Sequence, residues 1–258
     1  MARFSLTGYL RTTFGCEDPR SFRLCGMDEV GRGAYAGPLV AAAVILPPRF
    51  RHPLLRDSKL LTAKQREELA PIIRARALHW EVAEVSVAEI NSRGIGWANA
   101  DIFRRLAAGV EADGYCSDGR LRIPGDRRVH TLVKGDNLIP AISAASIVAK
   151  VHRDAHMTRL HGSAPEYAWA SNKGYGAPIH LDAIRRLGPH AEHRRVWISN
   201  LLQLDLDLGL PDAAVVAEPP GWGRGDPATD IALTGTGGSA AATRGTLPAV
   251  APVALQPG

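Results

Sequence analysis

The sequence contains little cysteine and no long apolar run. Its three cysteines, Cys16, Cys25 and Cys116, are too few and too widely spaced for a disulfide scaffold or a zinc module, and they favour a reducing compartment. No window approaches the roughly 20 apolar residues that a membrane-spanning helix needs. The first residues lack the sustained apolar stretch of a secretory signal. We therefore expect a cytoplasmic protein with no membrane partner.

Lysine is also scarce, although the chain is basic. The 31 basic residues include five lysines: Lys59, Lys64, Lys134, Lys150 and Lys173. All but Lys64 lie in the motif segments described below, which suggests sites that need a compact ammonium group near phosphate. The formal charge is +5, and residues 212–258 contribute −2, so residues 1–211 carry +7. Such a basic region suits a nucleic acid, although a solvated arginine-rich surface explains it equally well.

The chain is predicted to have three regions. Residues 1–21 are predicted to form an N-terminal extension, and residues 22–211 a folded domain. Residues 212–258, rich in Gly, Pro and Ala, are predicted to be a disordered tail. The continuous apolar run at 39–46 predicts a buried strand, and a capping box at Thr62 and Gln65 predicts the start of a helix that Pro71 should kink or split. The alternation of strands and helices indicates an α/β fold. Further strands are expected at 22–30, 80–87, 115–118 and 130–133, and helices at 62–79, 95–110, 140–160 and 178–187.

Acidic residues stand beside glycine or near the ends of predicted strands. Asp28 and Glu29 precede Gly31, Asp118 precedes Gly119, and Asp136 follows a glycine. Asp-Gly is also a common turn dipeptide, so Asp118 taken alone is more simply a turn residue. Asp28 follows an apolar strand, and a lone buried carboxylate is costly unless it is paired or binds metal.

Glu29 raises a geometric difficulty, because neighbouring residues of a strand point to opposite faces. Asp28 and Glu29 can serve one site only if the strand ends there, or if Glu29 acts through its backbone carbonyl or a water molecule.

Together these segments resemble the ribonuclease HII family, the type 2 ribonucleases H. The resemblance covers residues 24–197 and keeps the family order of motifs. It is carried by GMDEVGRGAYAGPLV (26–40), DSK (57–59), DG (118–119), VKGDNLIPAISAASIVAKVHRD (133–154), NKGYGAPIH (172–180) and EHRR (192–195).

The resemblance implies a ribonuclease H-like fold, a mixed five-stranded sheet flanked by helices with a helical C-terminal part. It also implies an endonuclease, expected to be a monomer, that cuts RNA paired to DNA and cuts 5′ to ribonucleotides embedded in duplex DNA. Such cuts leave 3′-hydroxyl and 5′-phosphate ends and serve to remove misincorporated ribonucleotides and RNA primers. The family's metal-binding catalytic acids correspond to Asp28, Glu29, Asp118 and Asp136, its glycine-arginine-glycine motif to Gly31, Arg32 and Gly33, and its junction-sensing tyrosine to Tyr175.

Hydrolysis by such an acidic cluster predicts two divalent ions, Mg²⁺ or Mn²⁺, which prefer oxygen ligands. Selectivity for RNA must come from the 2′-hydroxyl, which the loop of Gly31, Arg32 and Gly33 is expected to recognise together with Tyr175. The simpler alternative is that Tyr175 only packs against the 140–160 helix. Further predicted substrate contacts are Lys59, Ser146, Lys150 and Arg194. Ser143, Ser146, Lys150 and Asp154 share one face of the 140–160 helix, which is expected to line the site.

Asp154 is predicted as an auxiliary acid, and an ion pair with Lys150 is an equally good explanation for it. A zinc hydrolase using His152 and His156 is an alternative function, because their spacing suits two ligands on one helix. The glutamate of the HExxH pattern is absent, and the sequence indicates no third ligand. A protein that binds hybrids without cutting them is a further alternative.

Overall fold

The computed structural model describes residues 4–56, 61–119, 129–199 and 201. Within them, five strands form one sheet in the order β3-β2-β1-β4-β5. β1 pairs antiparallel with β2, and β2 with β3, whereas β1 with β4 and β4 with β5 are parallel. The predicted mixed sheet is confirmed. The strands are β1 (Leu24–Val30), β2 (Leu39–Ile45), β3 (His79–Val85), β4 (Gly114–Asp118) and β5 (Val129–Leu132).

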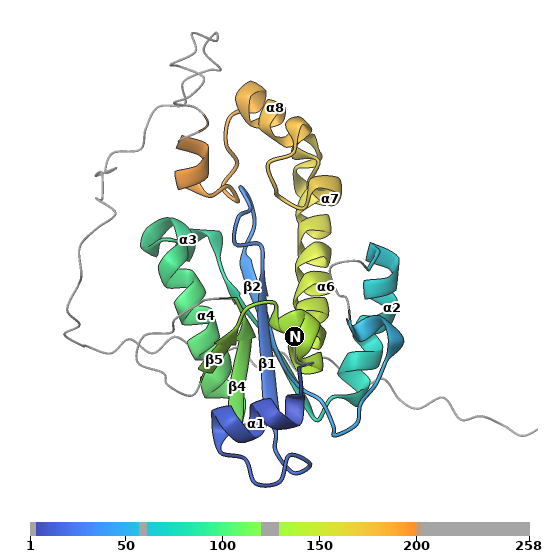
Figure 1. Ribbon diagram of the computed structural model, residues 1–258. Helices are drawn as coiled ribbons and strands as arrows, with labels where there is room; N and C mark the ends of the chain where they lie inside the picture. The colour runs from blue at the N-terminus through green and yellow to red at the C-terminus, as the bar shows by residue number, and fades with distance from the viewer. Residues whose placement is uncertain (1–3, 57–60, 120–128, 200, 202–258) are drawn as a thin grey trace, which may run out of the picture. The chain divides into compact units, whose positions relative to one another are not determined.

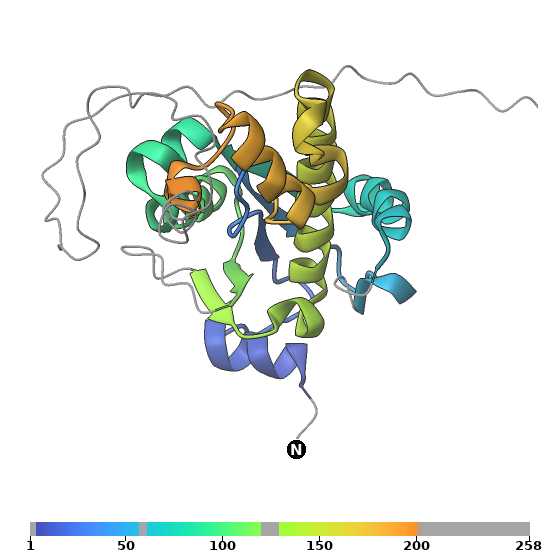
Figure 2. The same cartoon turned by 90° about the horizontal axis from the view of Figure 1, so that it is seen from above.

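Helices cover both faces of this sheet (Figures 1 and 2). One face carries α4, and the other carries α6 with α2 packed against it. None of the helices in the described residues is long and apolar enough to span a bilayer. The helices are α1 (Leu6–Phe14), α2 (Ala63–Arg76), α3 (Val87–Arg93), α4 (Ile95–Gly109), α5 (Gly135–Leu138), α6 (Pro140–Ser163), α7 (Trp169–Asn172) and α8 (Pro178–Leu187), with 3₁₀ turns η1 (Pro53–Arg56) and η2 (Pro165–Tyr167).

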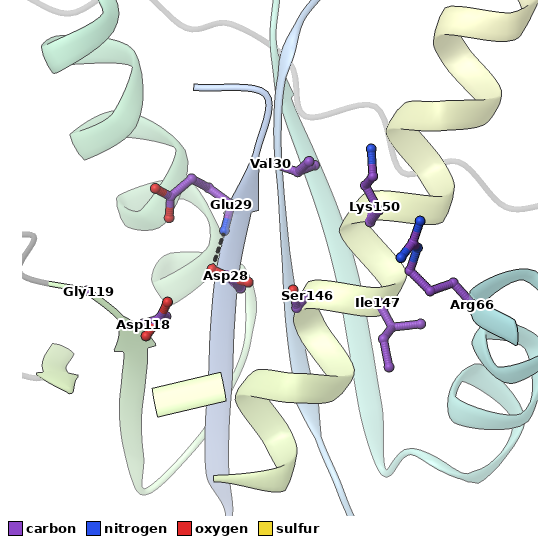
Figure 3. A pocket seen from close by; sticks show the side chains of 9 residues that line it. All are labelled: Asp28, Glu29, Val30, Arg66, Asp118, Gly119, Ser146, Ile147 and Lys150. Carbon is purple, nitrogen blue, oxygen red and sulfur yellow. Dashed lines mark hydrogen bonds between the residues drawn. The ribbon is translucent and has the colours of Figure 1, made fainter. Parts of the chain in front are cut away.

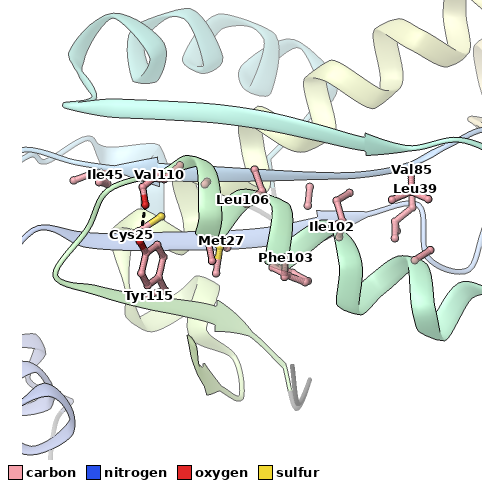
Figure 4. Close-up of a cluster of buried hydrophobic side chains, with 14 of the residues drawn as sticks. Cys25, Met27, Leu39, Ile45, Val85, Ile102, Phe103, Leu106, Val110 and Tyr115 are labelled. Atoms are coloured by element: carbon pink, nitrogen blue, oxygen red, sulfur yellow. Dashed lines mark hydrogen bonds between the residues drawn. The ribbon is translucent and has the colours of Figure 1, made fainter. Parts of the chain in front are cut away.

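The apolar run of β2 is explained by burial on both sides. Leu39 and Ile45 belong to the core cluster that packs on α4, whose side chains include Phe103 and Leu106 (Figure 4). Val40 and its alternate neighbours belong to the cluster under α6 and α2. A strand covered on both faces needs apolar residues at every position, and therefore shows no polar alternation.

Pro71 was expected to kink or split its helix. The prediction of a split is wrong, because α2 runs without a break from Ala63 to Arg76. Pro71 cannot donate to the carbonyl of Glu67, but both residues are exposed, so water can reach that carbonyl. The predicted capping box is confirmed: the Gln65 N–H donates to Thr62 Oγ1 at 3.2 Å, and the Thr62 N–H donates to Gln65 Oε1 at 2.9 Å.

The N-terminal segment contributes to the core. Leu10 of α1 is 4% exposed and belongs to a cluster with Cys116 and Ile142. A Cβ on Gly114 would lie 2.5 Å from the Phe14 ring, so α1 packs closely against the start of β4. A boundary at residue 21 stays a prediction. The tail predicted at 212–258 lies outside the described residues.

Candidate active site

Asp28 lies near the end of β1 on the face that α6 covers. It pairs in register with Ala42, which belongs to the cluster under α6, and its side chain points towards Ser146 (Figure 3). Asp28 is 9% exposed, and burial raises its pKa to about 7, with further increases from the charges of Glu29 and Asp118. A hydrogen bond from Ser146 opposes this rise. Burial and the neighbouring acids therefore favour the neutral form of this carboxyl group.

Asp118 ends the neighbouring parallel strand β4. The register places Met27 opposite Ser117, so Asp118 follows at the level of Asp28. Parallel neighbours are about 4.8 Å apart, which brings the two acids to one place. The Gly135 N–H donates to Asp118 Oδ1 at 2.8 Å. This contact joins β4 to α5, whose next residue is Asp136, 1% exposed.

Glu29 follows the alternation of the strand. It pairs with Ala41, whose side chain belongs to the α4 face, and Figure 3 shows its carboxylate on the opposite side of β1 from that of Asp28. β1 continues to Val30, the end expected from the sequence, so a strand end at Glu29 does not bring the two side chains to one face. Burial raises the pKa of Glu29, whereas the charge of Arg32 lowers it. A route through its backbone carbonyl or a water molecule stays a prediction.

Asp28, Glu29 and Asp118 border one pocket at this end of the sheet, whereas the predicted ligand Asp136 does not line it. Three of the predicted acids, two predicted polar contacts of α6 and an unpredicted arginine, Arg66, share its wall (Figure 3). Arg66 comes from α2, and only the packing of α2 on α6 brings it here. The lining residues are Asp28, Glu29, Val30, Arg66, Asp118, Gly119, Ser146, Ile147 and Lys150.

The predicted polar face of α6 lines the pocket only in part. Ser146 and Lys150 border it, whereas Ser143 is fully buried and donates to the Leu55 carbonyl. Lys150 Nζ lies 2.7 Å from Asp154 Oδ1, so the structure contains the ion pair that was the alternative for Asp154. An auxiliary role for Asp154 stays a prediction. Lys59 lies outside the described residues.

Two buried arginines donate hydrogen bonds to the loop that follows β1. We call this loop, residues 31–38, the glycine loop. Arg153 Nε donates to the Pro38 carbonyl at 3.0 Å and Nη2 to the Ala36 carbonyl at 2.9 Å. Arg194 is also fully buried, and it donates to the carbonyls of Gly37 and Arg32. Arg194 therefore faces the inner side of the loop, which differs from the direct substrate contact predicted for it. Gly31 has φ +90°, and a Cβ there would lie 2.2 Å from Arg153 Nε.

Tyr175 shows the packing that was the simpler alternative for it, and its junction-sensing role stays a prediction. Its ring lies 5.3 Å from Arg153 Cζ and 5.8 Å from Lys150 Nζ, so it packs against α6. The side chain is only partly buried, and Lys150 also borders the pocket. Arg153 Nη1 also donates to the Lys173 carbonyl at 2.8 Å. Arg153 therefore connects the glycine loop to residues 173–175, which we call the Tyr175 segment.

A buried histidine pair supports the backbone of Tyr175. The His190 N–H donates to His193 Nδ1 at 2.7 Å, so the other nitrogen of neutral His193 donates to His180 Nε2 at 3.0 Å. Trp169 Nε1 also donates to His180 Nε2, at 3.0 Å, which leaves His180 Nδ1 to donate to the Tyr175 carbonyl at 2.8 Å. Both rings must stay neutral for this chain of bonds, and burial lowers the pKa of His193 to about 3.

We expect this pair to make the fold sensitive to acid. Below pH 6.5 His193 is protonated in the unfolded chain, whereas in the folded chain it stays neutral until about pH 3. Stability is therefore lost as pH falls through this window, by roughly 2 kcal/mol between pH 6.5 and 5. Urea unfolding of the wild type and of His193→Gln at both pH values tests this. The variant should lose less stability on acidification, and His161→Gln should behave as wild type. An equal acid loss in all three proteins would contradict the prediction.

The histidines of the zinc alternative have another partner. His152 Nε2 lies 2.5 Å and His156 Nδ1 3.5 Å from the carboxylate of Glu84 on β3. These bonds hold the pKa of Glu84 at about 2. Among the described residues, no group of three or more His, Cys, Asp and Glu side chains is placed closely enough to hold a metal ion.

Comparison with known proteins identifies the family. The family model for ribonuclease HII matches residues 25–200. The ribonuclease HII of Koribacter versatilis is 43% identical over 203 residues, which cover 76% of this chain and 80% of that protein. The ribonuclease HII of Ralstonia nicotianae is 46% identical over 202 residues, covering 76% and 84%. The structure of the PCNA–RNase HII complex from Archaeoglobus fulgidus contains a chain with TM-score 0.61 and 28% identity, covering 71% of this chain and 98% of that one.

Proposed function

The chain belongs to the ribonuclease HII family and is a ribonuclease H, and from that premise we propose how it selects and cuts its substrate. The enzyme hydrolyses the RNA strand of RNA–DNA hybrids. The finer proposal is that it also cuts 5′ to single ribonucleotides in duplex DNA, leaving 3′-hydroxyl and 5′-phosphate ends. Such cuts would remove misincorporated ribonucleotides and RNA primers. The observation that carries this proposal is the pocket that Asp28, Glu29 and Asp118 share with Lys150 and Arg66.

The donor set fits divalent metal ions. Carboxylate oxygens are the ligands that Mg²⁺ and Mn²⁺ prefer. Burial and the charges of Glu29 and Asp118 raise the pKa of Asp28, which a cation would reverse. Asp28, Asp118 and Asp136 would hold the ions through their carboxylates, and Glu29 through its carbonyl or a water molecule. Two bound ions would supply activation of water and stabilisation of the leaving oxygen.

The cations of the pocket wall suit a phosphate. Lys150 and Arg66 border the pocket on the side opposite Asp118 (Figure 3). The ammonium of Lys150, already paired with Asp154, would neutralise a backbone phosphate as a compact charge, and the guanidinium of Arg66 could bind two of its oxygens. Ser146 holds Asp28 in place through its hydroxyl.

The glycine loop is suited to reading the 2′-hydroxyl. The Arg32 carbonyl points inwards to Arg194 Nη1 at 3.0 Å. In a trans peptide the following N–H points the opposite way, so the Gly33 N–H is directed away from Arg194. Gly33 is exposed, and a Cβ there would meet no atom within 4 Å. We infer that this N–H is available to bond the ribose, while the side chain of Arg32 holds an adjacent phosphate.

Tyr175 would recognise the junction from RNA to DNA. Its ring stands on the cationic side chains of Arg153 and Lys150, and its partly exposed side can stack on a sugar. A deoxyribose next to the ribonucleotide presents the apolar surface that such stacking favours. Substrate positioning would then depend on two segments, the glycine loop and the Tyr175 segment, which Arg153 connects.

A duplex with one ribonucleotide in one strand tests the proposal. We expect a single cut 5′ to that ribonucleotide when Mg²⁺ or Mn²⁺ is added, and none after chelation or in the all-DNA duplex. The new ends should be 3′-hydroxyl and 5′-phosphate, because water is the nucleophile. A 2′,3′-cyclic phosphate end would mean that the 2′-hydroxyl attacks, and would refute the mechanism. Cutting of long hybrids alone would refute the selection of single ribonucleotides.

A further inference from the structure

A second hollow lies beside the loop that follows β2. It is formed by this loop and by the last turns of α2, and it shares no residue with the acidic pocket. Its lining combines three guanidinium groups, an imidazole and an aromatic ring, without any carboxylate. The lining residues are Pro47, Pro48, Arg49, Phe50, Arg51, His52, Ile72 and Arg76. We call it the arginine groove.

The charge of this groove is uncompensated. Arg49, Arg51 and Arg76 are exposed, and none of them forms an ion pair with a carboxylate in the described residues. Arg51 Nη1 donates to the Phe50 carbonyl at 2.8 Å, which leaves its remaining donors open to a ligand. By contrast, Arg105 on α4 lies 2.6 Å from Asp101 and 2.9 Å from Glu89. The groove is therefore a concentrated positive site, and its ligand should be a polyanion.

The loop that carries Arg49 and Arg51 is held by hydrogen bonds within it. The Phe50 N–H donates to the Pro47 carbonyl at 3.1 Å, and the Leu54 N–H donates to His52 Nδ1 at 3.3 Å. Phe50 packs against the core cluster under α6 and α2. A loop already held in this way loses less conformational entropy when it binds a ligand.

The position of the groove relates it to the acidic pocket. Arg66 of α2 borders the pocket and Arg76 of the same helix borders the groove. Ten residues of helix span about 15 Å at 1.5 Å per residue. A double helix rises about 3.4 Å per base pair, so 15 Å corresponds to roughly four or five base pairs. A duplex centred on the pocket is therefore long enough to reach the groove.

We propose that the arginine groove binds the phosphate backbone of the substrate duplex four or five base pairs to one side of the cut. This inference rests on the proposed function, because it assumes that a duplex occupies the acidic pocket. The groove adds affinity and does not touch the reacting phosphate. Its loss should thus raise KM and leave kcat unchanged.

The test compares two triple variants that each remove three positive charges. One is Arg49→Gln, Arg51→Gln and Arg76→Gln, in the groove. The matched control is Arg11→Gln, Arg20→Gln and Arg159→Gln, which are exposed and border neither pocket. The substrate is a duplex with one ribonucleotide and arms of about ten base pairs. We expect the groove variant to raise KM roughly 5- to 20-fold, with kcat within about two-fold, and to flatten the salt dependence of KM by two to three charges. The control should stay near wild type.

Shortened substrates test the location. When the arm towards the groove is cut to about three base pairs, wild type and groove variant should become equal. When the other arm is shortened, the defect should persist. Equal behaviour of the two triple variants, or a defect that does not depend on either arm, would overturn the proposal. If the wild type cuts no duplex, the proposed function fails, and anisotropy with an all-DNA duplex still decides whether the groove binds nucleic acid.

Discussion

Replacing Asp28 with asparagine is expected to abolish cleavage and to stabilise the metal-free protein. The loss of activity should be about 10³- to 10⁴-fold, since the amide cannot supply the charge that a divalent ion requires. The gain in stability arises because Asp28 is 9% exposed and its folded-state pKa is raised to about 7 by burial and by neighbouring acids. Asparagine keeps the shape and removes the buried charge.

The sign of the pH dependence follows from the raised pKa of Asp28. Between pH 3.8 and about 7 the folded state binds a proton that the unfolded state releases. Wild-type stability attributable to Asp28 therefore falls as pH rises through this window, and it levels off above pH 7. Three pH units correspond to about 4 kcal/mol, which is the upper bound of the expected gain.

Urea unfolding of the metal-free proteins at pH 5 and pH 8 measures this gain. The advantage of Asp28→Asn should be larger at pH 8, and Mg²⁺ should reduce it by stabilising the wild type. A matched variant, Asp182→Asn on the exposed side of α8, should change neither activity nor stability. A variant that is destabilised at both pH values, or that still cuts, would contradict the assignment of Asp28.

Much of the sheet could be predicted because local patterns and burial agree. The apolar run at 39–46 matches β2, and the capping box at Thr62 marks the start of α2. The motifs predict one site for the acids, and Asp28, Glu29 and Asp118 do border one pocket. What could not be predicted depends on packing between segments distant in sequence. Arg66 borders the pocket only because α2 packs on α6.

The role of the buried Arg194 also could not be predicted from the sequence. A guanidinium that binds phosphate and one that binds backbone carbonyls use the same donors, so a motif cannot distinguish them. Arg194 was predicted to contact substrate, and it instead donates to carbonyls of the glycine loop. Glu29 shows the converse case: the strand expected at 22–30 matches the end of β1 at Val30, and strand alternation correctly predicts that the Glu29 side chain points away from that of Asp28.

Arg153 is expected to be the most sensitive position outside the acidic cluster. It is fully buried, and its guanidinium donates to the carbonyls of Pro38, Ala36 and Lys173. Arg153→Met would leave these carbonyls unpaired, at roughly 1–3 kcal/mol each, and we expect a total loss of about 4 kcal/mol. Arg153→Lys can restore only some of the bonds and should lose about half as much.

Activity should fall more than stability alone explains, because Arg153 connects the glycine loop to the segment of Tyr175. Misplacing these two segments should lower kcat/KM on a single ribonucleotide by roughly 100-fold in Arg153→Met, even at temperatures where the variant is folded. Arg159→Met, at an exposed position of the same helix, provides the control. Circular dichroism should verify folding before the kinetics are measured. Since the two segments would read the ribonucleotide together, a folded Arg153→Met with wild-type kcat/KM would show that their connection through Arg153 is not needed for recognition.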